Sequence, residues 1–328
     1  MSALAIACTL PALIAWACIA ALRGSRWSGR LADHPNARSL HERPTPRIGG
    51  LGMVAAILPF AASYAHGPLA AIFGCALALA AISLADDLRS LPIEVRLPAH
   101  ASAAAIALLA LSQPPLITWP WGWTGAALAV VGIVWATNLF NFMDGADGLA
   151  GGMAAIGFAA LAAGATLAGA GTLALLCAAI ASAAMGFLAH NFPPARAFLG
   201  DCGSTALGFL AAMLGLHGAL IGAWPGWFPL LVFSAFVVDA SVTLALRLAR
   251  RERFWIAHRD HAYQRLALAG WPRRRLALAA YALMGATAAS ALTALDAGSM
   301  VQCGILFFWA ATYALLAAAV GRLARRKA

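Results

Sequence analysis

The chain has 328 residues, of which 62% are hydrophobic and only 10% are charged. This composition excludes a water-soluble domain, because the exterior of a soluble protein of this size needs more polar surface than the sequence supplies. The apolar runs are rich in Ala and Leu and approach the roughly 20 residues that cross a bilayer as a helix. They lack the period-two alternation that is typical of a transmembrane β-barrel.

We therefore predict an all-α polytopic membrane protein, a single integral membrane domain over residues 1–328, with about eleven transmembrane helices. No basic region precedes the first span, and its first positive charge, Arg23, follows the apolar run, so we expect a retained helix and not a cleaved signal peptide. The six cysteines show no ligand spacing and are expected to be small apolar fillers. In chain order the predicted spans are 1–22, 49–65, 68–85, 97–112, 122–139, 149–169, 171–190, 203–222, 226–247, 275–294 and 299–321.

The net charge of +10 is the balance of 22 Lys and Arg against 12 Asp and Glu, and the Lys and Arg lie in alternate connections between the spans. This distribution follows the positive-inside rule. It places the N-terminus in the periplasm and the C-terminus in the cytoplasm, which requires an odd number of spans, as eleven is. Because membrane orientation explains the basic charge, no nucleic-acid partner is expected. The cytoplasmic connections are expected at about 23–48, 86–96, 138–148, 190–203 and 248–274.

Five acidic residues stand at cytoplasmic ends of the spans in otherwise apolar surroundings: Asp86, Asp87, Asp144, Asp147 and Asp201. Carboxylates in such places cost free energy unless they are paired or bind a metal. Helix capping could explain Asp147 or Asp201 singly. It does not explain the adjacent Asp86 and Asp87 at the C-terminal end of a helix, where the macrodipole disfavours anions. We therefore expect a cation-binding cluster, and oxygen-only ligands favour Mg²⁺.

The stretch "NLFNFMDGADGLAGG" places Asp144 and Asp147 three residues apart, on one side if the segment is helical. Gly145 and Gly148 let the backbone approach a ligand closely. The NxxDxxD spacing differs from the NxxxDxxxD of aromatic-substrate membrane prenyltransferases. It also lacks the Arg and the later Asp pair of CDP-alcohol phosphotransferases, and Ser90 breaks the DDxxD pattern of prenyl-chain enzymes.

Two further elements contain groups that suit a phosphate ligand. "FLGDCGSTALGF" opens the eighth predicted span, where backbone N–H groups at a helix start bind phosphate, and Asp201 could hold a metal that bridges it. The alternative is simple capping of the helix. "AHRDHAYQRL" groups His258, Arg259, His261 and Arg265. On the face that carries the acids, these residues favour diphosphate recognition over a solvated basic loop.

Six elements, in this order, resemble the polyprenyl-phosphate N-acetylhexosamine-1-phosphate transferase family, glycosyltransferase family 4, in its O-antigen-initiating branch. They are "DHPNARSLHERPTPRIGG", "ADDLRSLP", "NLFNFMDGADGLAGG", "NFPPARAFLGDCGS", "VVDASVTLALRLARR" and "HRDHAYQRL". The resemblance implies transfer of a sugar 1-phosphate from a UDP-N-acetylhexosamine to undecaprenyl phosphate, with release of UMP. It also implies a requirement for Mg²⁺ and a location in the bacterial inner membrane with the active site on the cytoplasmic face. Replacement of Mg²⁺ by Mn²⁺ and assembly into a homodimer are left open.

By the same resemblance, Asp86 and Asp87 are the paired catalytic carboxylates that deprotonate the lipid phosphate or assist metal binding. His261 also has a catalytic role, and Asp201, together with Asp87, holds the metal. Asp239 matches a recurrent Asp of the ninth span, with a structural pair to Arg and a substrate role both open. Phe198 either stacks on uracil or is an ordinary interfacial aromatic, and both are open. The expected donor contacts are Asn138, Asn141, Asp144, Asp147, Asn191, Phe198, His258, Arg259 and Arg265.

The chain departs from the family in its histidine element. Members often carry HxHH, but His261 is followed by Ala-Tyr-Gln, so only the first His is retained, and His258 is a candidate for partial replacement. The HxxHxYQR form resembles members that act on 6-deoxy-N-acetylhexosamines such as N-acetylfucosamine or N-acetylquinovosamine. Which residues take over the role of the two missing histidines is open.

Two other classes of protein compete with an enzyme. A lipid or solute transporter predicts charged residues along a path through both leaflets. Here the acids cluster at one face, and only Asp296 is expected outside. A non-catalytic membrane scaffold would leave the clustered carboxylates without a purpose. Both alternatives are therefore disfavoured.

Overall fold

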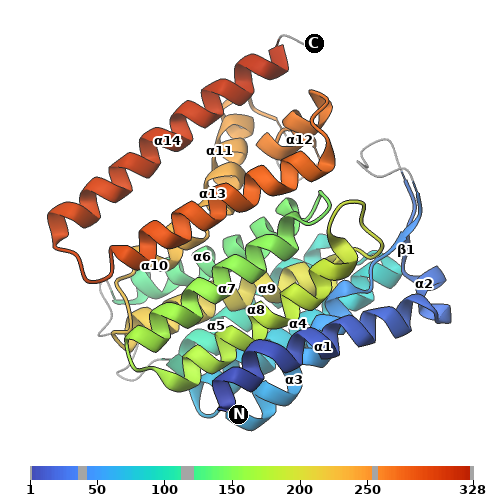
Figure 1. The fold of residues 1–328 in the computed structure, drawn as a ribbon, viewed down its shortest axis with the longest axis horizontal. Coiled ribbons are helices and arrows are strands. Elements are labelled where there is room, and N and C mark those ends of the chain that lie inside the picture. The colour runs from blue at the N-terminus through green and yellow to red at the C-terminus, as the bar shows by residue number, and fades with distance from the viewer. Residues whose placement is uncertain (1, 36–42, 112–121, 253–257, 326–328) are drawn as a thin grey trace.

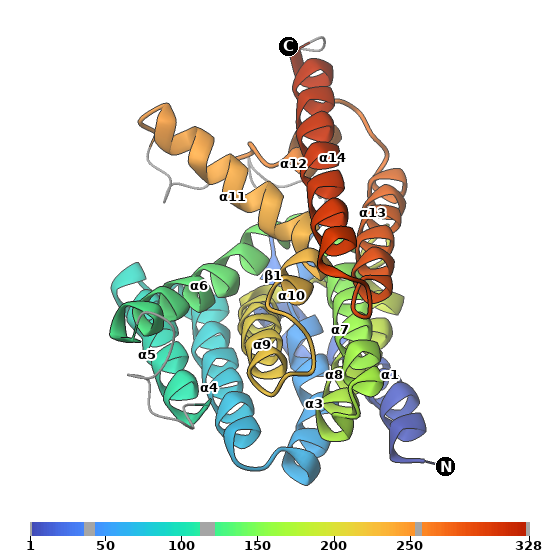
Figure 2. The same ribbon diagram turned by 90° about the vertical axis from the view of Figure 1, so that its left-hand side faces the viewer.

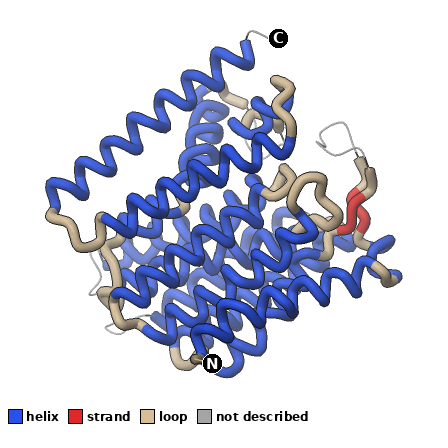
Figure 3. Tube along the Cα trace, in the orientation of Figure 1, coloured by secondary structure: helices blue, strands red, loops and turns tan. Residues whose placement is uncertain are grey.

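The computed structural model describes residues 2–35, 43–111, 122–252 and 258–325 (Figure 1). Figure 3 shows that these residues are almost entirely helical, apart from one short antiparallel ladder in which Ala32 pairs with Pro46 and Asp33 with Thr45. In chain order the elements are α1 (Ala3–Arg23), α2 (Arg26–Arg30), β1 (Ala32–Asp33), β2 (Thr45–Pro46), α3 (Gly49–Tyr64), α4 (Pro68–Arg89), α5 (Ile93–Leu111), α6 (Gly122–Met143), α7 (Leu149–Leu167), α8 (Gly171–Asn191), α9 (Gly200–Leu220), α10 (Trp227–Val232), α11 (Ser234–Ala249), α12 (Ala262–Leu268), α13 (Arg273–Thr293) and α14 (Ser299–Arg325).

The predicted all-α polytopic membrane architecture is confirmed. Among the described residues, nine helices are long and apolar enough to cross a bilayer, and α3 is a shorter apolar helix of 16 residues. Each of these ten corresponds to a predicted span. The span expected at 226–247 is different, because it is divided into α10 and α11.

The break between α10 and α11 lies at Phe233 and Ser234. The Ser234 hydroxyl donates to the carbonyl of Leu231 at 2.6 Å and lies 2.7 Å from the Tyr313 hydroxyl of α14. A serine hydroxyl that bonds a nearby carbonyl competes with the helical ladder. The sequence remains apolar across this point, so hydropathy alone predicted one continuous helix.

The centre of the bundle consists of α7, α8 and α9, which are rich in Ala and Gly. Small residues let helix backbones approach closely inside a membrane protein. Gly186 of α8, for example, lies against the backbone of Ala12 in α1. Figure 2 shows α9 enclosed by its neighbours, whereas α14 lies outside the bundle. In the most apolar stretch of each helix, 78% of the residues of α9 are buried and 6% of those of α14.

At one end of the bundle, the segment from β2 to α3 is joined to the segment before α9. The Phe198 N–H donates to the Pro46 carbonyl, and the Phe198 carbonyl accepts the Gly49 N–H, both at 2.8 Å. The Gly50 N–H donates to the Leu199 carbonyl, also at 2.8 Å. These bonds fix the start of α9 beside the start of α3, at the same end as the last turn of α4.

Candidate active site

Asp87, in the last turn of α4, lies over the N-terminus of α9. Its carboxylate accepts the Cys202 N–H at 3.2 Å, and its side chain has no exposed surface. Gly200 makes this approach possible, because its φ is +74° and a Cβ there would lie 3.0 Å from Asp87 Oδ2. Arg47 Nη1 lies 3.4 Å from Asp87 Oδ1. A helix N-terminus and a guanidinium therefore stabilise the buried anion.

Asp86 has different partners from its neighbour. Its carboxylate accepts the Leu91 N–H at 2.6 Å and a bond from Arg96 Nη1 at 2.8 Å. These bonds close the turn between α4 and α5, where Ser90 has a left-handed backbone. The two adjacent carboxylates thus do not depend on a shared cation or a shared proton, because each has its own arginine.

Asp201, in the first turn of α9, is connected to the end of α6 by a hydrogen bond from the Asn141 side chain. Its carboxylate lies 4.0 Å from Arg96 and is 32% exposed. Asp144 follows α6 directly. Burial, and then the nearby Asp201 and Asp87 carboxylates, raise the pKa of Asp144 well above its usual value, against the effect of Arg47. The carboxylates of Asp87, Asp144 and Asp201, from the end of α4, the loop after α6 and the start of α9, therefore lie in one small region.

The donor set in this region fits a magnesium ion. No group of three or more His, Cys, Asp or Glu side chains within metal-binding distance of one another occurs among the described residues. Mg²⁺ commonly binds through one or two carboxylates and completes its shell with water and substrate phosphates. Asp201 and Asp87 are such a pair, because the Asp87 carboxylate accepts the N–H of Cys202, the residue that follows Asp201. The residues present therefore suit the expected ion.

Asp147 and Asn191 connect two loops. Asp147 Oδ2 accepts the Ala195 N–H at 3.1 Å and lies 3.6 Å from Arg273. The Asn191 side chain accepts the Gly148 N–H and donates to the Ala197 carbonyl, both at 2.9 Å. Capping of the next helix, the alternative explanation for Asp147, is not what the structure shows, since Gly148 occupies the N-cap position of α7. Nor do Asp144 and Asp147 share a helix face, because α6 ends at Met143.

The histidine element forms the entry to α12. The buried His261 ring lies between His258, at 4.9 Å between centroids, and Tyr263, at 5.9 Å. Both Asp239 carboxylate oxygens accept the Ala262 N–H, at 2.9 and 3.1 Å, and Asp239 Oδ1 lies 3.5 Å from His261 Nδ1. Asp239 of α11 thus holds the start of α12 in place and faces its histidine.

α12 docks on the end of α6. The Tyr263 hydroxyl donates to the Phe142 carbonyl at 3.1 Å, and the same hydroxyl fills the space beside Gly145. This contact brings the histidine element next to the loop that contains Asp144. Burial, followed by the positive charges of His261 and Arg247, lowers the pKa of His258.

The other predicted donor contacts have different surroundings. Asn138 Nδ2 donates to the Val134 carbonyl at 2.7 Å and lies 3.3 Å from Nδ1 of His100, on α5. Phe198 is half-buried, in the segment joined to Pro46 and Gly49. Arg259 and Arg265 are half-buried at and just before α12. The ligand roles given to these residues stay predictions.

Sequence reasoning gave no role to Arg47, Arg96 or Tyr263, although Arg47 and Tyr263 fall inside the quoted motifs. Arg47 is also 2.5 Å from Asp33, so it connects the β-ladder to Asp87. A signal for it existed in "TPRIGG", where an arginine stands two residues before the glycines that open a predicted span. Nothing in the local pattern identified Arg96 as the partner of Asp86.

The part of the chain that matches a known protein family contains the clustered aspartates. The family model for "Glycosyl transferase family 4" matches residues 69–219, which run from α4 to the end of α9 and include Asp86, Asp87, Asp144 and Asp201. The chain is 28% identical over 262 residues to a probable undecaprenyl-phosphate N-acetylglucosaminyl 1-phosphate transferase of Bacillus subtilis (strain 168), covering 76% of this chain and 73% of that protein.

Two further relatives extend this likeness. A phospho-N-acetylmuramoyl-pentapeptide-transferase of Thermosynechococcus vestitus (strain NIES-2133 / IAM M-273 / BP-1) is 33% identical over 270 residues, 72% of this chain and 70% of that protein. An undecaprenyl-phosphate alpha-N-acetylglucosaminyl 1-phosphate transferase of Escherichia coli (strain K12) is 31% identical over 193 residues, 55% of this chain and 53% of that protein. The chain belongs to glycosyl transferase family 4.

Proposed function

We propose that this membrane protein transfers an N-acetylhexosamine 1-phosphate from a UDP-sugar to undecaprenyl phosphate and releases UMP. The family and the names of its relatives support this reaction. The observation that carries the proposal is the meeting of Asp87, Asp144 and Asp201 with Arg47 at the N-terminus of α9. The reaction takes place at the cytoplasmic face of a bacterial inner membrane, where the basic connections lie.

The chemistry is phosphoryl transfer. An oxygen of the lipid phosphate forms a bond to the phosphorus that bears the sugar, and the bond from that phosphorus to the bridging oxygen breaks, so that UMP leaves with the electron pair. Catalysis of this kind rests on positioning and on neutralising charge. The Cys202 N–H at the start of α9 is already bonded to Asp87, so Arg47 is the group that binds and orients the anionic phosphates. When bound, Mg²⁺ on Asp201 and Asp87 supplies further charge neutralisation for the diphosphate.

Asp87 is the better candidate of the two adjacent carboxylates to act on the lipid phosphate. Asp86 is occupied by the Leu91 N–H and Arg96, whereas Asp87 faces the start of α9. His261, Arg259 and Arg265 face the same end of the bundle and offset charge on the diphosphate, with His258 beside His261. Mn²⁺ suits the same oxygen ligands.

For the donor, we propose a 6-deoxy-N-acetylhexosamine such as N-acetylfucosamine or N-acetylquinovosamine, on the basis of the HxxHxYQR element. The product would start an O-antigen or another surface polysaccharide. The test is incubation of the purified protein in nanodiscs with undecaprenyl phosphate, Mg²⁺ and a panel of UDP-sugars, with UMP release as the readout. Release with a 6-deoxy donor supports the full proposal. Release only with other donors overturns the sugar assignment, and no lipid-dependent release with any donor overturns the reaction.

A further inference from the structure

Three consecutive arginines open α13, in the sequence Trp271, Pro272, Arg273, Arg274 and Arg275. The first turn of this helix contains no acidic residue. The macrodipole disfavours cations at the N-terminus of a helix, and adjacent like charges also repel each other. The placement of these arginines therefore costs free energy that a bound anion would offset.

The three arginines differ in their partners. Arg273 lies 3.6 Å from the Asp147 carboxylate and is half-buried. Arg274 and Arg275 are exposed, and among the residues that the structure describes neither of them forms an ion pair with a carboxylate. Two positive charges thus stand at the end of a membrane helix, and no carboxylate of the described chain is paired with them.

Aromatic rings support both exposed arginines. The guanidinium carbon of Arg275 lies 4.4 Å from the centre of the Trp271 ring, and that of Arg274 lies 5.9 Å from the centre of the Phe192 ring. An aromatic face attracts a cation, which orders the side chain but leaves its charge in place. Tryptophan is also enriched at the membrane–water interface. The rings therefore hold two charged groups ready for an anion at that interface.

The two arginines lie at the level of the phospholipid headgroups. Leu278 follows Arg275 by three residues and Arg274 by four, so it is their neighbour on the surface of α13. Its side chain is 49% exposed, and Ala282 and Ala286, about one and two turns further on, are exposed as well. Since α13 is long and apolar enough to cross a bilayer, this apolar face lies against lipid tails. The arginines stand where the tails give way to headgroups.

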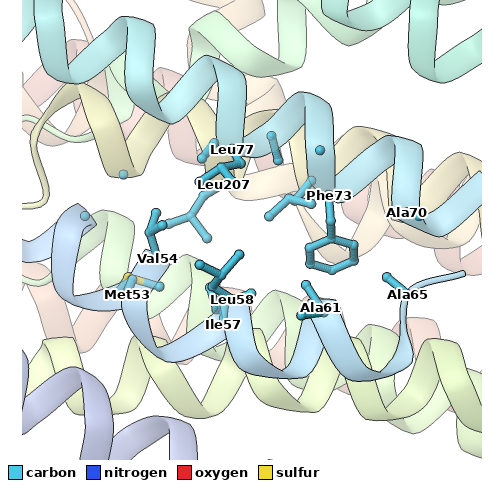
Figure 4. Close-up of a pocket in the computed structure, with 17 residues that line it drawn as sticks. Met53, Val54, Ile57, Leu58, Ala61, Ala65, Ala70, Phe73, Leu77 and Leu207 are labelled. Carbon is cyan, nitrogen blue, oxygen red and sulfur yellow. The ribbon is translucent and has the colours of Figure 1, made fainter.

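An apolar groove between α3 and α4 provides a contrast (Figure 4). The described residues that line it are all Gly, Ala, Val, Leu, Ile, Met or Phe. Phe73 and Leu77 of α4 face Val54 and Leu58 of α3 across the gap. These side chains do not distinguish one phospholipid headgroup from another, whereas the charges at the start of α13 do.

We propose that Arg274 and Arg275 bind the phosphate of an anionic phospholipid such as phosphatidylglycerol, with an acyl chain along Leu278. The planar guanidinium group matches the oxygens of a phosphate, and basic sites at the cytoplasmic ends of membrane helices attract anionic headgroups. A phosphatidylcholine headgroup contains its own cation, so it gains less from two arginines. Such a lipid belongs to the surrounding bilayer and is not a substrate, so the site does not depend on the proposed transfer reaction.

The experiment measures binding of phosphatidylglycerol and phosphatidylcholine to the purified protein in detergent, by native mass spectrometry at low ionic strength. The test variant combines Arg274→Gln and Arg275→Gln. The matched control combines Arg250→Gln and Arg251→Gln, which removes two exposed arginines at the end of α11. Each arginine near an anionic headgroup contributes about a fivefold factor in affinity, so we expect wild type to bind phosphatidylglycerol on the order of twentyfold more tightly than phosphatidylcholine. This preference is lost in the test variant and kept in the control.

Two further variants separate charge from geometry. Arg274→Lys with Arg275→Lys keeps both charges and should retain part of the preference, because an ammonium group lacks the planar fork. Trp271→Leu removes the ring beside Arg275 and should weaken phosphatidylglycerol binding by about two- to fivefold. The melting temperature of each variant shows whether it is folded. If the Gln variant is not, the Lys variant and Trp271→Leu decide.

The other outcomes overturn the inference. Loss of the preference in the control as well means that lipid is attracted by the basic surface as a whole. An equal loss of phosphatidylcholine binding in the test variant means that the substitutions damage the helix packing. Equal binding of the two lipids by wild type excludes headgroup recognition. Displacement of phosphatidylglycerol by glycerol 1-phosphate would assign the arginines to a soluble phosphate and not to a lipid.

Discussion

The Asp87 carboxylate accepts the backbone N–H of Cys202 at 3.2 Å, which joins the C-terminal end of α4 to the N-terminal end of α9. An anion at the end of a helix is disfavoured by the macrodipole of its own helix. Here the start of a second helix and Arg47 offset that cost. The arrangement holds a negative charge in a buried position beside Asp144 and Asp201, where charge is useful for binding a metal and phosphates.

The two adjacent aspartates should respond differently to amidation. Asp87→Asn keeps an oxygen that can accept the Cys202 N–H but removes the charge, so we expect kcat to fall by about 10²–10³ with the fold retained. Asp86→Asn weakens the bond to Arg96 and should mainly reduce stability, by about 1–2 kcal/mol. Steady-state UMP release and thermal melts in detergent measure both effects. Equal losses of kcat in the two variants would contradict the separate roles.

Arg47 should contribute to binding of the anionic substrates. Arg47→Gln removes the cation beside Asp87 and Asp33, and we expect KM for the substrates to rise about tenfold, since a hydrogen bond to a charged group contributes about 1.5–3 kcal/mol. Arg47→Lys keeps the charge and should recover only part of the loss, because it cannot contact two carboxylates with one planar group. Wild-type kinetics in Arg47→Gln would show that the residue does not face the substrates.

Asp239 should act through α12. Asp239→Ala removes both acceptors of the Ala262 N–H, and we expect a loss of about 1 kcal/mol, as for a helix N-cap, together with a lower kcat. Asp239→Asn retains one acceptor and should be milder. Thr243→Val is the matched control, because it removes only the hydroxyl that bonds Asp239. Melting temperature and UMP release of the three variants test the order.

The packing of α1 on α8 should depend on Gly186. An added Cβ would lie 2.9 Å from the carbonyl carbon of Ala12, so Gly186→Ala should destabilise the protein by about 1–3 kcal/mol through overpacking. Gly285→Ala, where a Cβ meets nothing, should be neutral or stabilising by up to about 1 kcal/mol. Unfolding in mixed detergent compares them, and equal stability of the two variants would contradict the close approach of the helices.

Acidification should cost stability at His258. The pKa of His258 is lowered in the folded protein, from about 6.5 in an unfolded chain. Just below pH 6.5 the unfolded state therefore binds more protons at His258 than the folded state does. The free energy of unfolding is thus highest above that pH and decreases as the pH falls. We expect His258→Gln to show a smaller drop in melting temperature between pH 7.5 and about 5.5 than wild type. An identical drop would exclude His258 as a source of the pH dependence.

The sequence predicted the membrane helices better than it predicted the contacts of the site. Apolar runs and alternating basic connections were sufficient for ten spans, because both follow from the bilayer. At the break between α10 and α11, the Ser234 hydroxyl contacts the Tyr313 hydroxyl, 79 residues away, and no local pattern predicts that contact. Asp86 and Asp87 are adjacent residues of the same type, so the sequence does not distinguish them. Only the packing of α4 against α9 decides which one faces the site.

We propose that Asp87, Asp144 and Asp201 form the site of metal-dependent phosphoryl transfer to a lipid phosphate. The most direct measurement is UMP release from the preferred UDP-sugar by wild type and Asp201→Asn, with and without undecaprenyl phosphate, before and after removal of divalent cations by EDTA. We expect UMP release only with lipid, its loss with EDTA, its recovery on adding Mg²⁺, and a rate at least about 10² lower in Asp201→Asn. Full, metal-independent turnover in a folded Asp201→Asn protein would contradict it.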